Sequence, residues 1–481
     1  TPTETGGDSL PTNCFAYSAA GTRLNSSAVN PTEAEQTFTL TTALILKKGA
    51  IETISIKCDI PSGLTADNSF RWTLTGGTNT WTGVGSTSGQ SVTVGVKANG
   101  NGATWTYKGA GTFTVVRDAS SPSYTVVRAG QNNVTVGVLR FTGTNEEQKL
   151  TRLGVQLTNT ASSSNATAIG ISLWDGATKV GSGLFSGSAT TATINLDGTF
   201  TIPKDGTKLM TVKADIANIG VSESGVQGAL VAIDYDGGSA DNETLGTMSG
   251  TTIEDSSSSD TAVEGIRVFK SVPTFARLAV PSSVLVSGTT MDLYRFSISA
   301  APSNGNGIGI YKFTINVATS STPTSASTTL TNLKVMAYTD SGFSSPVSGF
   351  SPPGQLNDTT ANFGSSTNLL LTAATGNEDV LQIPAGGTYY FAVKADVTLT
   401  GAITAGTIVT FIEGDNAYTA LPDLMSTTTR LNDGSSLNAS NNFLWSPNAT
   451  TTSATTTPDW TNGYLIPGLP TAGMDATTIS K

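Results

Sequence analysis

The chain has 481 residues and a formal net charge of −10 at pH 7, and only 12% of its residues are charged. It carries no basic stripe that could bind phosphate groups, which excludes nucleic acid as a partner. No apolar run is long enough to cross a bilayer, so we expect a chain that does not span a membrane. Histidine is absent, which excludes every catalytic triad, general base and metal site that depends on an imidazole.

Threonine, serine, asparagine and glycine, rather than ions, make this chain polar, and its mean hydropathy is −0.02. Threonine is favoured in β-strands, and glycine and asparagine are favoured in the turns between them. No stretch shows the sustained period of an amphipathic helix. The composition therefore predicts an all-β protein.

One strand occurs three times, at residues 54–60 (ISIKCDI), 210–216 (MTVKADI) and 391–397 (FAVKADV). Each copy alternates with the two-residue period of a half-buried β-strand, and a glycine-containing turn precedes each copy. The intervals between the copies are long enough for one domain each. The repeat therefore predicts a tandem array of related β-domains.

In the first copy, Ile54, Ile56, Cys58 and Ile60 share one face, and the lysine and the aspartate share the other. An active site at the same strand position of every domain is a poor explanation for the recurring Lys-x-Asp pair. We expect the aspartate to accept backbone N–H bonds at the end of the strand, and the lysine to lie on the solvated face.

Further strands are predicted from the same alternation, in chain order. In the first domain they span residues 36–46, 51–60, 69–75, 103–107 and 112–117, after a polar stretch over 1–34. In the second domain they span 133–141, 149–157, 169–173, 193–196, 209–216 and 229–235, with a tight Asp-Gly hairpin at 174–177. In the third domain they span 291–300, 311–317, 332–339, 391–397 and 407–413, with a Ser/Thr-rich loop over 320–331.

The predicted domains span residues 1–112, 113–268 and 269–430. The last segment, 431–481, carries large aromatic residues such as Trp445 and Trp460, which are usually buried in folded proteins. Such residues rarely belong to a free tail, so we expect this segment to dock on the third domain or on a neighbouring subunit.

The first domain is short or incomplete, because only 53 residues precede Ile54 and they leave room for one or two strands. Three explanations stay open. The first is that it is a reduced capping domain. The second is that the N-terminal part of the domain was removed by processing or by the choice of fragment, since the chain begins at Thr1 with no signal peptide. Alternatively, a strand from another subunit completes its open edge.

The two cysteines, Cys14 and Cys58, both lie in the first domain. In an exported protein we expect them to form a disulfide. The alternative is a buried thiol that acts as a small apolar side chain, because Cys58 stands where the later copies have Ala214 and Ala395.

Acidic residues gather at Asp234, Asp236 and Asp241, in a glycine-containing loop. Carboxylate and carbonyl oxygens from such loops bind calcium, although the spacing does not match an EF-hand. The alternative is a solvated turn without a metal. We therefore name calcium as the one candidate cofactor, with these three residues as its ligands.

No catalytic apparatus is evident, because serine and threonine lack an activating base and no carboxylate pair stands out. We therefore expect a protein that is not an enzyme. Seven sequons fit the pattern for N-glycosylation, although many arise by chance in such a composition, and O-glycans on the Ser/Thr loops are equally compatible. Their asparagines are Asn25, Asn133, Asn165, Asn242, Asn357, Asn438 and Asn448.

Several segments resemble long surface proteins of Patescibacteria. They are residues 129–142 (AGQNNVTVGVLRFT), 173–176 (LWDG), 202–206 (IPKDG), 212–215 (VKAD) and 459–470 (DWTNGYLIPGLP). The resemblance spans most of residues 36–481 and implies an exported, S-layer-like protein built of Ig-like antiparallel β-sandwich domains. Proteins of this kind often carry an N-terminal wall-binding region, which is absent from this sequence. The resemblance brings no catalytic residues.

Together these features predict an extracellular structural protein at the cell surface that assembles with itself into an S-layer or a filament. Few charges repel one another when its neutral polar faces pack side by side. The alternative is a cell-surface adhesin or glycan-binding stalk, whose partners would be cell-wall or surface glycans. A secreted β-rich hydrolase would need a buried carboxylate pair, which the sequence does not single out.

Overall fold

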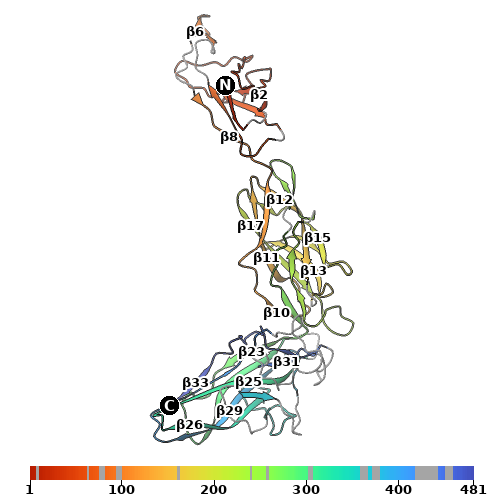
Figure 1. Ribbon diagram of the computed structural model, residues 1–481, viewed down its shortest axis with the longest axis vertical. Coiled ribbons are helices and arrows are strands. Elements are labelled where there is room, and N and C mark those ends of the chain that lie inside the picture. The colour runs from red at the N-terminus through yellow and green to blue at the C-terminus, as the bar shows by residue number, and fades with distance from the viewer. Residues whose placement is uncertain are drawn as a thin grey trace. The chain divides into compact units, whose positions relative to one another are not determined.

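The computed structural model describes residues 1–6, 10–61, 64–74, 82–93, 100–159, 163–238, 241–255, 259–301, 307–357, 367–370, 380–417, 442–449 and 459–481. Throughout these residues the regular structure is β-strand, as predicted (Figure 1). They include no helix of the length and hydropathy that a membrane span requires. The chain forms two compact units.

The N-terminal unit comprises Thr1–Thr112 together with Thr144–Glu147 and Gly246–Thr251. One of its sheets contains β1 (Pro2–Thr5), β4 (Ser69–Leu74), β7 (Gly100–Asn101) and β8 (Trp105–Thr106). β2 (Thr12–Tyr17) pairs with β3 (Ser55–Asp59), and β5 (Thr82–Val84) pairs with β6 (Ser91–Thr93). β3 is the first copy of the repeated strand.

The larger unit begins, in chain order, with a middle sandwich. One sheet has the order β14-β13-β17-β11-β9. These strands are β9 (Thr112–Arg117), β11 (Val134–Thr144), β13 (Ala168–Asp175), β14 (Thr178–Gly183) and β17 (Thr207–Ile216). The other sheet has the order β15-β12-β20-β21, and β16 and β19 also pair with β12. Its strands are β12 (Gln148–Leu157), β15 (Thr191–Asn195), β16 (Thr201–Ile202), β19 (Ile233–Tyr235), β20 (Glu243–Gly246) and β21 (Thr252–Glu254). A third sheet joins β10 (Thr125–Arg128), β22 (Ile266–Phe269) and β18 (Ala229–Val231).

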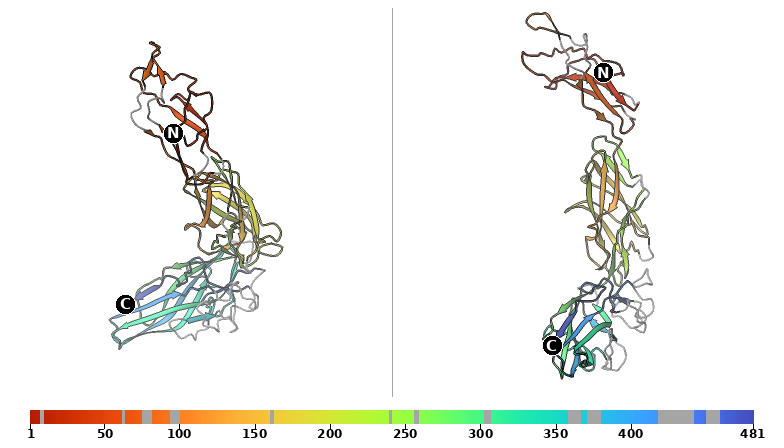
Figure 2. Two further views of the ribbon diagram at one scale, coloured as in Figure 1. Left: turned by 45° about the horizontal axis from the view of Figure 1, so that its top comes forward. Right: turned by 60° about the vertical axis from the view of Figure 1, so that its left-hand side comes forward.

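A C-terminal sandwich follows in the same unit, and its long strands lie side by side in both views of Figure 2. One sheet has the order β23-β24-β29-β26, formed by β23 (Pro273–Leu278), β24 (Thr289–Ala300), β26 (Ser327–Tyr338) and β29 (Thr388–Thr400). The other has the order β32-β31-β25-β30-β33, with β27 and β28 also paired to β25. Its strands are β25 (Ile308–Thr322), β27 (Thr367–Leu370), β28 (Leu381–Ile383), β30 (Ala405–Ile412), β31 (Leu444–Ser446), β32 (Thr461–Asn462) and β33 (Thr477–Ser480).

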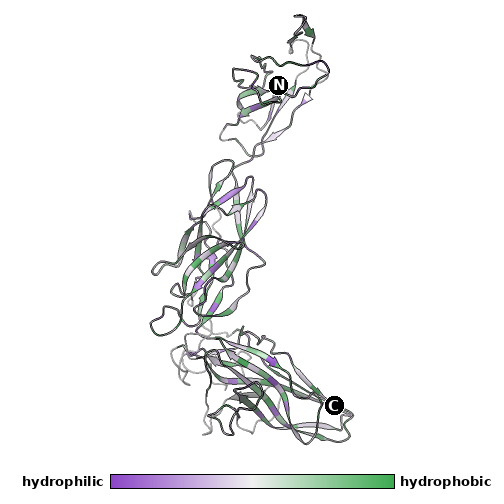
Figure 3. Cartoon of the chain, turned by 180° about the vertical axis from the view of Figure 1, so that it is seen from behind, coloured by the Kyte–Doolittle hydropathy of each residue, from purple (hydrophilic) through white to green (hydrophobic). Residues whose placement is uncertain are grey.

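Each sandwich encloses one apolar core between its two antiparallel sheets. In the C-terminal sandwich Phe296 and Phe391 of one sheet are fully buried together with Phe313 and Ile408 of the other. The rings of Phe296 and Phe391 stack with centroids 4.8 Å apart. Along the strands hydrophobic and hydrophilic residues are interleaved (Figure 3). Two sheets packed over a shared core are the architecture of Ig-like β-sandwiches, so the predicted fold class is confirmed.

The repeated strand is central in both sandwiches of the larger unit. β17 lies between β13 and β11, and β29 lies between β24 and β26. Its apolar face is closed, since Met210, Val212, Phe391 and Val393 are all fully buried. A strand with hydrogen-bonded neighbours at both edges and a core beneath it has no exposed apolar face.

The first copy differs from the other two. Ile54 is 40% exposed and Ile60 is 56% exposed, and regular pairing covers only Ser55–Asp59. The expectation that Ile54, Ile56, Cys58 and Ile60 form a buried face is therefore wrong for the N-terminal unit. Its physical cause is the small core of this unit, whose described buried hydrophobic side chains are Cys14, Ala16, Leu24, Phe70 and Tyr107.

Three further expectations are corrected by the structure. The strand predicted over residues 36–46 does not form, and residues 43–54 also lie outside any strand. The predicted Ser/Thr loop over 320–331 is shorter in the structure, where residues 323–326 connect the end of β25 to the beginning of β26. Threonine and serine hydroxyls can also pair across strands, which is why the rest of this stretch is β-strand. β2 lies in the stretch over 1–34 that the sequence marked only as polar.

The described part of the C-terminal segment belongs to the C-terminal sandwich. β31 pairs with β25, and β33 pairs with β30. Trp445 and Trp460 are completely buried, and the Trp445 indole N–H donates a 2.8 Å hydrogen bond to the carbonyl of Asn462. Residues 431–441 and 450–458 of this segment lie outside the described residues.

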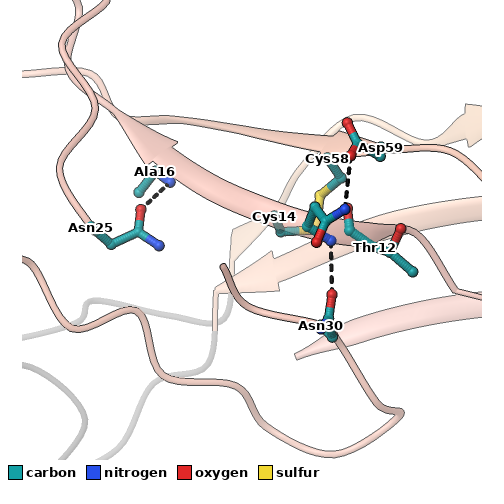
Figure 4. The surroundings of a disulfide bond; sticks show 8 residues. Thr12, Cys14, Ala16, Asn25, Asn30, Cys58 and Asp59 are labelled. Carbon is teal, nitrogen blue, oxygen red and sulfur yellow. Dashed lines mark hydrogen bonds between the residues drawn. A yellow bond between two sulfur atoms is a disulfide. The ribbon is translucent and has the colours of Figure 1, made fainter. Parts of the chain in front are cut away.

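Cys14 on β2 and Cys58 on β3 form a disulfide, which joins the only two strands of their sheet among the described residues (Figure 4). The two cysteines are 44 residues apart. A two-stranded ribbon is marginally stable on its own, and a cross-link over such a loop lowers the entropy of the unfolded chain. The disulfide therefore compensates for the small core of the N-terminal unit.

We predict that replacing both cysteines by serine lowers the free energy of unfolding of the N-terminal unit by about 3 kcal/mol. The larger unit contains neither cysteine, so its unfolding transition is expected to stay where it is. Differential scanning calorimetry would measure both transitions, and reduction of the wild-type protein is the matched control. An unchanged N-terminal transition in both cases would contradict the prediction.

Candidate functional site

The lysine of the repeated strand lies over an aromatic ring in every copy. Lys57 lies over Tyr17 with its Nζ 4.9 Å from the ring centroid, and Lys213 lies over Trp174 at 4.1 Å. Lys394 lies over Tyr338 at 5.9 Å, and its ammonium is also 3.2 Å from a carboxylate oxygen of Asp292. The expected solvated lysine is therefore a cation–π partner of the neighbouring strand.

The aspartate of the repeated strand contacts an asparagine on a neighbouring strand or at its start. Asn13 donates a 2.9 Å side-chain hydrogen bond to Asp59, and the Asn133 backbone N–H donates a 2.8 Å bond to Asp215. The Asn332 side chain donates to Asp396. Hydrogen bonds from Thr290 and Asn332 hold the pKa of Asp396 below its usual value. The predicted backbone N–H donor is thus present at Asp215, whereas Asp59 and Asp396 accept hydrogen bonds from asparagine side chains.

These three asparagines share an unusual backbone conformation. The φ angles of Asn13, Asn133 and Asn332 are 50°, 55° and 53°. Asparagine adopts this left-handed region more readily than other residues with a Cβ atom. The Thr-Asn-apolar sequences at 12–14 and 331–333 carry two of them, and this is the signal from which the contact could have been predicted.

Irregularities in strand register identify which strands correspond to one another. β2 and β26 shift register by the same step, between the partners of the motif aspartate and the motif lysine, and β13 shifts beside the partner of Asp215. β11 and β24 each shift opposite the motif lysine. Tyr17, Trp174 and Tyr338 also lie on β2, β13 and β26. β2 therefore holds the place of β13 and β26, and among the described residues no strand fills the place of β11 and β24 beside β3.

Exposed hydrophobic residues are frequent in the chain directly before β3 and at its end. The exposed large hydrophobic residues of the N-terminal unit are Leu40, Ile45, Leu46, Ile51, Ile54, Ile60, Leu74, Val84, Val92, Trp105 and Met248. Ile51 is 94% exposed and Ile45 is 68% exposed. Four of these residues stand within 43–54, and such a concentration in one short stretch favours an interaction surface. We regard β3 and residues 43–54 as the candidate functional site.

The acidic residues proposed as calcium ligands do not converge on one point. Asp234 is buried, and its two carboxylate oxygens accept hydrogen bonds from the Thr158 hydroxyl and the Val263 N–H. Burial raises the pKa of Asp234, and burial together with Asp260 and Asp241 raises that of Asp236. In the described part of the chain no three histidine, cysteine, aspartate or glutamate side chains are grouped to hold a metal. Calcium binding at Asp234, Asp236 and Asp241 stays a prediction.

The sequon asparagines differ in their access to solvent. Asn25, Asn242, Asn357 and Asn448 are buried. The Asn25 side chain, for example, accepts a bond from the Ala16 N–H (Figure 4). It also donates one to the Ser27 carbonyl. Asn133 is exposed, Asn165 is half-buried, and Asn438 lies outside the described residues. Glycosylation stays a prediction, and solvent access favours Asn133 because an attached sugar must extend into water.

One surface hollow of about 320 Å³ lies on the middle sandwich, lined in part by Arg117, Asp118, Arg140 and Glu264. Arg140 donates a 2.8 Å hydrogen bond to Asp118, and Arg117 pairs with Glu264. Hydrogen bonds from Ser120, with support from Arg140, lower the pKa of Asp118 to about 2. A carboxylate that is ionised and paired in this way is a weak general acid or base near neutral pH.

One carboxylate is buried deep in the C-terminal sandwich. Asp415 is fully buried and accepts hydrogen bonds from the backbone N–H groups of Asn442, Phe443 and Gly463. Burial raises its pKa to about 6, against these hydrogen bonds and the charge of buried Lys312. Burial likewise lowers the pKa of Lys312. Asp415 therefore fastens β31 and the chain that follows β32 to the end of β30.

Comparisons with known proteins give no family. No protein-family model and no curated protein matches the chain. Similar solved structures include the C-terminal domain of the Streptococcus agalactiae AgI/II polypeptide BspA, at 10% identity over 64% of this chain and 97% of that chain, with a TM-score of 0.18. A putative membrane anchored protein from Corynebacterium diphtheriae is 12% identical over 86% of this chain and 81% of its own, with a TM-score of 0.14. The collagen adhesin of S. aureus is 10% identical over 63% and 85%, with a TM-score of 0.12. At these scores the likenesses carry no argument about function.

We predict that the stability of the C-terminal sandwich depends on pH through Asp415. Its folded-state pKa of about 6 lies above the ordinary 3.8, so the folded chain binds more protons than the unfolded chain between these values. The free energy of unfolding should therefore fall as pH rises from about 4 to about 6, by about 3 kcal/mol in total. Urea denaturation at a series of pH values measures this change.

The variant Asp415→Asn removes the titrating group and should remove this fall, while Asp205→Asn in an exposed turn should keep the wild-type profile. Parallel profiles for wild type and Asp415→Asn would show that another group is responsible.

Proposed function

We propose that this chain is an extracellular structural protein that assembles with itself into a surface layer or filament. The observation that carries the proposal is the exposed apolar surface of the N-terminal unit, which includes Ile45, Leu46, Ile51 and Ile60. Exposed apolar side chains are unfavourable in water and are stabilised when another protein covers them. Self-association would cover these side chains in every copy of the chain.

The internal construction of the chain supports a structural role. Each of the two sandwiches has a well-buried core, and the few charged residues leave neutral polar faces that can approach each other. The Cys14–Cys58 disulfide supports an extracellular location, because disulfides persist in oxidising compartments. The proposal assigns no catalytic activity to the chain.

We predict that the purified protein forms ordered layers or filaments when its concentration is raised. Negative-stain electron microscopy and sedimentation measure the assembly, and parallel samples with calcium or with EGTA show whether calcium affects it. A monomer at every concentration, with and without calcium, would refute self-assembly.

An adhesin would behave differently in the same samples. It would stay monomeric and bind cell-wall or surface glycans, which a glycan array detects. The outcome of both measurements therefore separates the structural role from the adhesive one.

A further inference from the structure

We propose that β3 pairs with β3 of a second copy of this chain, antiparallel and centred on Cys58, so that one sheet continues across two molecules. The inference rests on the proposed self-assembly and names one of its contacts. It follows from three observations: the open edge of β3, the direction of the strands that fill this place elsewhere, and the order of side chains in β3.

The open edge is defined by comparison within the chain. β2 corresponds to β13 and β26, so the second edge of β3 corresponds to the edges of β17 and β29 that pair with β11 and β24. In the described part of the N-terminal unit no strand occupies this edge. An unpaired strand edge presents a row of N–H and C=O groups, which is a template for a strand of another molecule.

The direction of the incoming strand follows from the same comparison. β11 runs antiparallel to β17, and β24 runs antiparallel to β29. Two copies of β3 related by a two-fold axis perpendicular to the sheet are antiparallel to each other, and each presents the same edge. A symmetric dimer therefore supplies a strand of the required direction to both molecules at once.

The register follows from the sequence of β3 and its next residue, Ile56-Lys57-Cys58-Asp59-Ile60. With Cys58 opposite Cys58, each Lys57 lies opposite Asp59 of the second copy, and each Ile56 lies opposite Ile60. Centring the pair on Lys57 would place two lysines opposite each other, and centring it on Asp59 would oppose two aspartates. Opposite charges across strands stabilise a pair and like charges destabilise it, so the register centred on Cys58 is favoured.

The pairing also brings exposed isoleucines of the two copies into contact. Ile54 and Ile60 are 40% and 56% exposed, whereas the corresponding Met210 and Ile216 of β17 are 0% and 1% exposed. In the dimer each Ile60 faces Ile56 of the second copy on the same side of the sheet. The apolar face of β3 is thereby extended from one strand to two.

The test exchanges the charges of β3 in the full-length chain. Lys57→Asp places aspartate opposite Asp59 of the second copy, and Asp59→Lys places lysine opposite Lys57. Each single variant occurs twice in a symmetric pair, and we expect each to raise the dimer dissociation constant about tenfold or more. The double variant Lys57→Asp/Asp59→Lys restores opposite charges, and its dissociation constant is expected to return toward the wild-type value.

Analytical ultracentrifugation measures the dimer. Lys204→Asp, an equal charge change at an exposed position in the turn before β17, is the matched control and should dimerise as wild type. Circular dichroism and the absence of free thiols verify that each variant is folded with its disulfide formed. Rescue by the double variant supports the proposed register, because loss of the Asn13–Asp59 hydrogen bond is common to Asp59→Lys and to the double variant.

Two results would overturn the inference: single variants that dimerise as wild type, or a double variant no tighter than the single ones. Electron microscopy of the same samples separates this failure from failure of the proposed function. If the wild type assembles and the charge variants assemble equally well, only the β3 pairing is wrong. If the wild type stays monomeric throughout, the self-assembly proposal fails as well.

Discussion

The arrangement of this protein depends on one constraint: a β-strand buries its apolar face only where neighbouring strands pair with its edges and a second sheet covers it. β17 and β29 meet this constraint, and their apolar side chains form the cores of the two sandwiches. β3 has the same alternating pattern, but among the described residues its one strand neighbour is β2, and Ile54 and Ile60 are exposed. The different environments of three strands with the same alternating pattern therefore arise from their neighbours.

This constraint also explains how much of the fold could be predicted from the sequence. Alternation located most strands of the two sandwiches, including the long β24 and β29, because half-buried strands impose a period of two. The same alternation over residues 36–46 predicted a strand that does not form, since a pattern cannot reveal whether a partner edge is available. β2 could not be predicted from alternation because its sequence, TNCFAY, is short and partly polar. The cation–π contacts could not be predicted because the aromatic partners of the motif lysines lie on strands far away in sequence.

The polar residues of the repeat position the backbone. The motif aspartates hold asparagines in the left-handed conformation beside register shifts, and the motif lysines lie over rings of the adjacent strands. The chain has few charged residues, and several of them position the backbone through such contacts. Asp415 likewise holds the C-terminal segment through hydrogen bonds from the backbone N–H groups of that segment. The candidate site could be located only in part from sequence. The shortage of strands in the first domain was evident, but the identity of the open edge required the register of β13, β26 and β2.

The Cys14–Cys58 disulfide has a mechanical consequence for a protein under tension. A force that enters the chain before Cys14 and leaves it after Cys58 passes through the covalent bond between the two strands. The enclosed loop, which includes residues 43–54, then bears no load and cannot be drawn out. This loop would span about 150 Å if it were fully extended, and the disulfide prevents this length from adding to the extension of a stretched molecule. Under mechanical stress the exposed isoleucines of this loop would therefore stay next to β3. They would remain accessible to another molecule.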